Sequence, residues 1–181
     1  MDISLKTFTN RCSIRRKYLD VYKYVFSELV FISAHKGVDI SFKPIDDAVM
    51  SDLNAQWKNV KFDWESLFLR YRRFCKRIDF AIYYEDQLVA MLFGKVSIGR
   101  RVIRIDYIEA TSKSSRPPAL EAVAALALAT IESIGKQLES EYIALRNPTN
   151  KKVSDHYKKY QYSFDVEFDG VRANTMYKKI L

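Results

Sequence analysis

Three strand-like stretches follow one another in the middle of the chain, and one long apolar helical stretch then leads to a further short strand. The Glu85-Asp86-Gln87 turn between the first two strands predicts a hairpin. The helix begins with Pro117 and Pro118, which suit a first helical turn because no intrahelical hydrogen bond is lost there. A strand, helix and strand in this order predict a right-handed crossover within a mixed sheet. The five elements are expected at residues 80–84, 88–96, 102–110, 117–139 and 142–146.

The two flanks of this central pattern add further helices and strands. Residues 14–36 repeat apolar side chains every three or four positions, which predicts a helix that ends at Gly37. The alternating stretch VDISFKPI predicts a strand that ends at Pro44. Further helices are expected from Asp46 or Asp47 to about residue 57, after Asp63, and from about 150 to 160, and a last hairpin at 162–168 and 172–180.

This order of elements predicts an α/β (α+β) fold with a mixed, mostly antiparallel central sheet flanked by helices. Residues 1–37 are expected to form an N-terminal helical extension, and residues 38–181 a single domain. A length of 181 residues is enough for one hydrophobic core.

The composition is that of a soluble protein without a metal. No apolar run reaches the length of a membrane span, and the N-terminus lacks the apolar core of an export signal, so we expect a cytoplasmic location and no membrane partner. Cys12 and Cys75 are isolated from each other, and the chain has only 2 histidines. We therefore expect free thiols and no metal site.

The segment from Asn147 to Phe164 reads as a strand end, a turn, one amphipathic helix and a further strand. The spacing of Asn150, Val153, Tyr157 and Tyr162 resembles the N-x2-A-x3-Y-x4-F pattern of the Gcn5-related N-acetyltransferase superfamily. The order of elements from residue 38 to residue 181 is similar to that superfamily as well. The resemblance implies an acyl-CoA-dependent N-acyltransferase with acetyl-CoA, or another acyl-CoA, as co-substrate and a primary amine as acceptor.

The same resemblance implies roles for residues of this segment. Asn150 is expected to contact the pantetheine arm of the coenzyme, and Asn147 lies in the same turn. Tyr157 is expected to donate its proton to the departing thiolate, because the pKa of a phenol is close to that of a thiol. The alternative is that Tyr157 is a core tyrosine of an amphipathic helix in a chain with 12 tyrosines.

A pyrophosphate-binding loop is expected between the third strand and the long helix. The superfamily pattern there is Q/R-x-x-G-x-G/A, and Arg116 matches its first position, whereas Ala119 and Glu121 replace the glycine and the glycine or alanine. The cofactor-binding residues expected in or near this loop are Thr111, Ser112, Lys113, Arg116 and Ala119. A plain connection into a helix that begins with proline is the alternative.

A general base for the amine is sought on the strand at 102–110. Alternation places Ile103, Ile105, Tyr107 and Glu109 on one face of this strand and Asp106 on the other. Glu109 is the first candidate and Asp106 the second, because a carboxylate at the end of an apolar strand face can accept a proton directly or through water. The alternatives are a carboxylate in solvent or one paired with a neighbouring arginine.

The net charge of +8 suits a polyanionic coenzyme and also a nucleic acid. Basic clusters occur at residues 15–17, 70–77 and 100–104, and each alone is typical of a solvated face or turn. Convergence of the clusters on one face would favour anion binding. The aromatic and basic region at 57–77 corresponds to the acceptor side in the superfamily and suggests an acidic or planar acceptor, or an acidic partner.

Three functions stay open at this level. The first is an N-acyltransferase that acts on an unidentified amine. The second is a nucleic-acid-binding or DNA-modifying protein on the same scaffold, and the third is a non-catalytic interaction module. The N-terminal helix, with its basic and aromatic side chains, packs either on the domain or on a second copy in a homodimer, or it contacts nucleic acid.

Overall fold

The computed structural model describes residues 3–97, 99–112, 123–168 and 170–181, and for residues 3–10 it describes the backbone alone. The helices are α1 (Ile3–His35), α2 (Asp47–Gln56), α3 (Trp64–Tyr71), α4 (Val123–Gln137) and α5 (Lys151–Lys158). The strands are β1 (Ile40–Lys43), β2 (Arg77–Tyr84), β3 (Gln87–Val96), β4 (Val102–Ala110), β5 (Tyr142–Arg146) and β6 (Thr175–Lys179).

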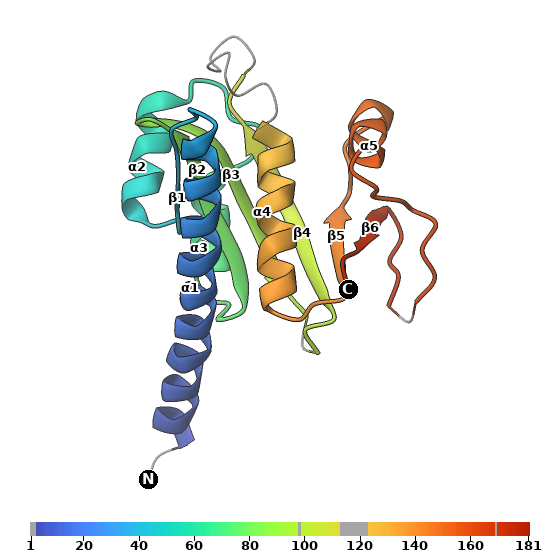
Figure 1. Cartoon of the computed structure of the whole chain (residues 1–181). Coiled ribbons are helices and arrows are strands. Elements are labelled where there is room, and N and C mark those ends of the chain that lie inside the picture. Colours follow the sequence, from blue (N-terminus) through green and yellow to red (C-terminus); the bar gives the residue numbers. More distant parts are fainter. Residues whose placement is uncertain (1–2, 98, 113–122, 169) are drawn as a thin grey trace.

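The strands form one sheet in the order β1-β2-β3-β4-β5-β6, as Figure 1 shows. All neighbours are antiparallel except β4 and β5, which are parallel and are joined through α4. The predicted mixed, mostly antiparallel sheet flanked by helices is therefore confirmed. The crossover predicted from the strand, helix and strand pattern is the α4 connection.

Helices cover both faces of the sheet, with α1 and α4 on one face and α2 and α3 on the other. On the first face, Tyr22 and Phe26 of α1 and Ile131 of α4 share a core with Phe80 of β2. On the second face, buried residues of α2 and α3 pack on the next residues of the same strands. The central strands are thus sealed on both sides, which explains their nearly continuous apolar sequences.

The first helix is longer than the sequence pattern suggested. The pattern predicted a helix at 14–36, whereas α1 begins at Ile3. Its buried residues among those described begin with Tyr18, and its first turns extend past the edge of the sheet in Figure 1. Hydrophobic periodicity predicts the part of a helix that packs on a core, so the described residues 11–17, none of which is buried, gave only a weak signal.

The predicted last hairpin is wrong in one of its two strands. Between residues 162 and 168, pairing is limited to a single bridge between Ser163 and Tyr177, and β6 is shorter than the predicted strand at 172–180. The Arg172 amide donates to the Tyr177 hydroxyl at 2.9 Å instead of joining a ladder. A side chain therefore replaces the backbone partner that a second strand would need.

Candidate functional site

The two parallel strands separate partway along their length. Pairing of β4 with β5 runs from Val102 opposite Tyr142 to Ile105 opposite Leu145. Beyond this point β5 ends at Arg146, while β4 continues from 106 to 110, where β3 is its only strand neighbour among the described residues. Figure 1 shows the two strands diverging toward α5. We call this region the β4–β5 opening.

Backbone groups of β4 face the opening. The Thr111 amide donates to the Val89 carbonyl at 2.9 Å, so Thr111 and, by alternation, Glu109 and Tyr107 direct their backbone groups toward β3. The N–H and C=O groups of Ile108 and Ala110 therefore point to the other side, where β5 no longer runs. An extended ligand with amide groups could pair with them as a further strand would.

A β-bulge lies where the strands separate. Phe93 is opposite Tyr107 and Gly94 is opposite Ile105, so Asp106 has no partner on β3. Our alternation of this strand was therefore wrong: Tyr107 joins the core on the α3 face, whereas Ile105 belongs to the core on the α1 face. The bulge adds one residue and reverses the parity of the strand, which brings Glu109 to the α3 face too.

The bulge also requires a glycine on the neighbouring strand. A Cβ atom on Gly94 would lie 2.3 Å from the Arg104 carbonyl oxygen and 3.1 Å from the Ile105 Cα. Any other residue would force the two backbones apart, so Gly94 permits the close approach of β3 and β4 at the bulge.

Asp106 is the centre of an ionic cluster at the base of the opening. Its side chain is only 4% exposed, and it lies 2.7 Å from Arg104 Nε and 3.6 Å from Arg146 Nη1. The Tyr71 hydroxyl donates to Asp106 Oδ2 at 2.6 Å, and burial together with this hydrogen bond raises the pKa of Tyr71 well above its ordinary value. The cluster ties α3 and the end of β5 to the bulge of β4.

Glu109 is also engaged by neighbouring groups. It is 6% exposed; Oε1 accepts from the Lys61 amide at 2.8 Å, and Oε2 accepts from Trp64 Nε1 at 2.9 Å. The carboxylate thus fastens the segment before α3 to β4. Its role as general base stays a prediction, as does that of Asp106, and a proton acceptor at either position would have to act while holding these donors.

The turn between β5 and α5 has the geometry of a helix start. Asn150 caps α5, because its Oδ1 accepts from the Val153 amide at 3.0 Å. Asn147 is in the left-handed region with φ 48°, and its amide donates to the Asn174 carbonyl at 2.8 Å. Both asparagines are exposed where β5 ends beside the opening. Contact of either with a coenzyme stays a prediction.

Tyr157 lies at the margin of the core on the α1 face. It is half-buried and packs against that core, as do Ile108 and Ala110 of β4. Burial raises the pKa of its phenol, so the group keeps its proton at neutral pH. Within the part of the chain that the structure describes, its hydroxyl has no hydrogen-bond partner. This position is compatible with a proton donor at the opening.

The segment after β4 is described only in part. Thr111 is buried, and Ser112 is exposed. Lys113, Arg116 and Ala119, which we expect to bind pyrophosphate, lie outside the described residues. The helix predicted to begin at Pro117 is described from Val123 onward.

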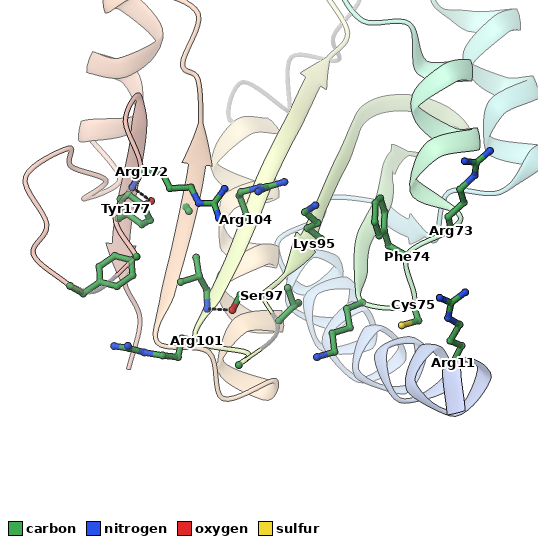
Figure 2. A pocket seen from close by; sticks show the side chains of 17 residues that line it. Arg11, Arg73, Phe74, Cys75, Lys95, Ser97, Arg101, Arg104, Arg172 and Tyr177 are labelled. Atoms are coloured by element: carbon green, nitrogen blue, oxygen red, sulfur yellow. Dashed lines mark hydrogen bonds between the residues drawn. The ribbon is translucent and has the colours of Figure 1, made fainter. Parts of the chain in front are cut away.

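A strongly basic hollow of about 730 Å³ lies at the end of the sheet where β4 begins. Figure 2 shows Arg11 and Arg73 on one side of it and Arg104 and Arg172 on the other, with Lys95 and Phe74 between them. No carboxylate is among the described residues that line it. The basic clusters at 70–77 and 100–104 thus converge on one surface, where single positions of α1 and of the C-terminal loop join them.

Local sequence reasoning missed Arg11, Lys95 and Arg172 as members of this surface. Each is an isolated basic residue in the sequence, and only the folded chain brings them together. Among the described residues, no group of histidine, cysteine and acidic side chains is arranged to hold a metal ion. None of the described helices has both the length and the apolar character needed to cross a bilayer.

Comparison with solved structures places the chain among acetyltransferases in fold. The ribosomal-protein-S18-alanine N-acetyltransferase of Escherichia coli aligns with a TM-score of 0.56 at 8% identity, over 78% of this chain and 94% of that one. The PaiA N-acetyltransferase of Thermoplasma acidophilum, solved with coenzyme A, aligns at 0.55 and 13% identity over 78% and 99%. Arabidopsis thaliana Naa50, solved with the bisubstrate analogue CoA-Ac-MVNAL, aligns at 0.52 and 13% identity over 77% and 97%. No protein-family description and no curated protein sequence matches the chain.

Proposed function

We propose that this chain, which has the fold of the Gcn5-related N-acetyltransferase superfamily, is an acyl-CoA-dependent N-acyltransferase. The observation that carries the proposal is the β4–β5 opening, where two parallel strands pair for four positions and then separate beside a bulge. A complete parallel ladder would bury this edge of β4. Where the pairing ends, the outward backbone donors and acceptors of β4 would instead pair with an extended co-substrate.

The residues around the opening provide the contacts that a CoA thioester requires. The backbone groups of Ile108 and Ala110 would pair with the amides of the pantetheine arm. The side-chain amide of Asn150 and the turn at Asn147 would lie along the same arm. Thr111, Ser112, Lys113, Arg116 and Ala119 are the proposed pyrophosphate-binding residues, because they follow directly on β4.

The chemistry proposed for the site is a direct transfer. The nitrogen of a primary amine attacks the thioester carbon, the carbon–sulfur bond breaks, and the amine loses one proton. The Tyr157 phenol would supply a proton to the departing sulfur, and its raised pKa keeps that proton in place until the thiolate forms. Because Glu109 and Asp106 already accept hydrogen bonds, the amine proton would leave through a water toward one of them.

Isothermal titration with acetyl-CoA and with free CoA tests this proposal. We expect saturable binding of both ligands, since most contacts are proposed to involve the parts that they share. Thiol release in the presence of mixed primary amines would then measure turnover. An absence of binding at millimolar ligand would overturn the proposal.

A further inference from the structure

The basic hollow continues into a second one. The adjoining hollow, of about 650 Å³, shares Arg11, Arg73, Phe74 and Cys75 with the first. Together the two are lined by ten of the 30 basic residues of the chain, eight of them arginines. Among the described residues, no aspartate or glutamate lines either hollow. We call the two hollows together the basic trough.

Some of the basic side chains of the trough form ion pairs with buried carboxylates, and others do not. Arg15 and Arg77 both pair with the buried Asp79, and Arg104 pairs with Asp106. In contrast, the side chains of Arg11, Arg73, Lys95 and Arg172 have no carboxylate within ion-pair distance in the described part of the chain. The trough therefore carries an excess of positive charge that a bound anion would relieve.

The lowered pKa of Lys95 agrees with this excess of positive charge. Burial lowers the pKa of Lys95, and the nearby charge of Arg104 lowers it further. The charges of Arg146 and Arg172 act in the same direction, against the opposite effect of Asp106. The neighbouring positive charges thus add to burial, the largest cause, in lowering the affinity of this lysine for its proton.

We propose that the basic trough binds a single-stranded segment of nucleic acid and that the amine acceptor of the reaction is carried on that ligand. The location of the acceptor on that ligand rests on the proposed acyl transfer, whereas the binding of nucleic acid does not. The phosphates would contact Arg11, Arg73, Lys95 and Arg172.

Three features favour a nucleic acid over an acidic polypeptide. The cations are spread over two adjoining hollows, as a repeating backbone charge requires. Most of them are arginines, whose planar guanidinium groups suit phosphate oxygens. Phe74, which is 40% exposed, lies among them with Lys95 Nζ 4.8 Å from its ring centroid, so a base that stacks on this ring would bring its phosphate close to that lysine.

The trough is also connected to the β4–β5 opening. Arg104 lines the trough, and its guanidinium contacts Asp106, the bulged residue at which β4 leaves β5. Arg146, the last residue of β5, reaches the same carboxylate. A ligand in the trough would therefore lie next to the point at which β4 and β5 separate, and its amine would enter the opening from there.

Fluorescence anisotropy of the full chain with a labelled single strand of about twenty nucleotides tests the proposed binding of nucleic acid. Single-stranded DNA, single-stranded RNA and a duplex of the same sequence are compared with a poly-glutamate peptide and with polyphosphate. We expect a single strand to bind most tightly, with log K falling against log salt at a slope of about −3 for four phosphate contacts. No binding at low salt, or a preference for poly-glutamate, would overturn the proposal.

Two double charge-reversal variants distinguish binding in the trough from binding that depends only on the net charge of the protein. Arg73→Glu with Arg172→Glu should weaken single-strand binding by about tenfold or more and reduce the salt slope by about 1.4. Lys23→Glu with Lys36→Glu changes the net charge equally at exposed residues that line neither hollow, and should leave binding within about threefold. Equal losses in both variants would show that the binding does not involve the trough. Arg11→Glu is the replacement if the first variant does not fold.

Acetyl-CoA titration of the same proteins distinguishes the two proposals. If acetyl-CoA binds and the single strand does not, the trough proposal fails and the proposed function stands. If the single strand binds through the trough and acetyl-CoA does not bind, the proposed function fails, and with it the proposal that the nucleic acid carries the amine acceptor. Acetylation of the bound strand, detected by mass spectrometry, would support both the binding of the strand and its role as the amine acceptor.

Discussion

At the scale of single residues, the partners of a side chain decide which chemistry it can perform. Asp106 and Glu109 are both buried carboxylates of β4, yet Asp106 sits between two arginines while Glu109 accepts from one amide and one indole. Both carboxylates therefore already have ion-pair or hydrogen-bond partners in the folded chain. Tyr157, in contrast, has a hydroxyl with no partner among the described residues, which suits a group that transfers its proton during the reaction.

Glu109→Gln tests whether that carboxylate has a structural role. The amide group would place a donor against either the Lys61 N–H or the Trp64 indole N–H, so one hydrogen bond is lost and a buried donor is left unsatisfied. We expect a loss of about 1–3 kcal/mol in the free energy of unfolding, measured by urea denaturation. If Glu109 is also the base, the acidic limb of the pH–rate profile should disappear as well, whereas unchanged stability would contradict the structural role.

Tyr157→Phe tests the proton donor. Removal of the hydroxyl should lower kcat by about 10²–10⁴-fold, with the Kd for acetyl-CoA changed little, because the lost interaction acts only as the thiolate forms. Tyr160→Phe, at the end of the same helical segment, is the matched control and should retain its rate. A Tyr157→Phe enzyme as fast as the unaltered protein would contradict the assigned role.

At the scale of elements, the bulge of β4 sets the geometry of the site. It turns Tyr107 and Glu109 toward α3, and it coincides with the end of pairing between β4 and β5. A strand without the extra residue would continue the alternation of Ile103 and Ile105 and would present different side chains to each core. The opening thus depends on the register between β3 and β4.

Gly94→Ala tests this dependence. The new methyl group would meet the Arg104 carbonyl, so the strands must move apart at a cost of about 1–3 kcal/mol in the free energy of unfolding. Binding of acetyl-CoA should weaken as well if the bulge shapes the opening. Gly99→Ala is the control, since nothing lies within 4 Å of the added atom and its stability should change by less than about 0.5 kcal/mol. Equal stability of the two variants would argue against a strained contact.

At the scale of the whole molecule, tyrosine hydroxyls join separate parts of the fold through carboxylates. Tyr22 contacts Asp79, Tyr71 contacts Asp106, Tyr83 contacts Asp52 and Tyr162 contacts Glu132. Burial is the main cause that raises the pKa of each of these four phenols above its ordinary value. Their protons are therefore held more tightly in the folded chain than in the unfolded one.

This difference predicts a loss of stability at high pH. Below about pH 10, the ordinary tyrosine pKa, the phenols are protonated in both states and their contribution is fully present. Above it, the unfolded chain releases protons that the folded chain retains, so the free energy of unfolding should fall as pH rises toward the folded values. Urea denaturation between pH 8 and pH 11, with tyrosinate absorbance followed in parallel, measures this. Stability that stays flat while these tyrosines ionise in the folded protein would refute it.

The sequence alone determined the order of elements as far as α5, the fold class and the helix cap at Asn150, because these follow from short-range periodicity, turn chemistry and capping. The roles of Tyr157 and Asn150 toward a coenzyme came from a resemblance and stay predictions. Local patterns could not give the length of α1 beyond its buried turns, or the single bridge that replaced a strand after Tyr162. Both depend on what the segment packs against.

Only the tertiary structure decided the register of β4 and the assembly of the basic trough. A bulge exists only relative to a neighbouring strand, so the alternation of one strand cannot reveal that Asp106 has no partner on β3. The trough unites Arg11, Arg73, Lys95 and Arg172, which come from four separate parts of the chain. Their repulsion opposes convergence, and the buried cores on both faces of the sheet supply the free energy that holds them together.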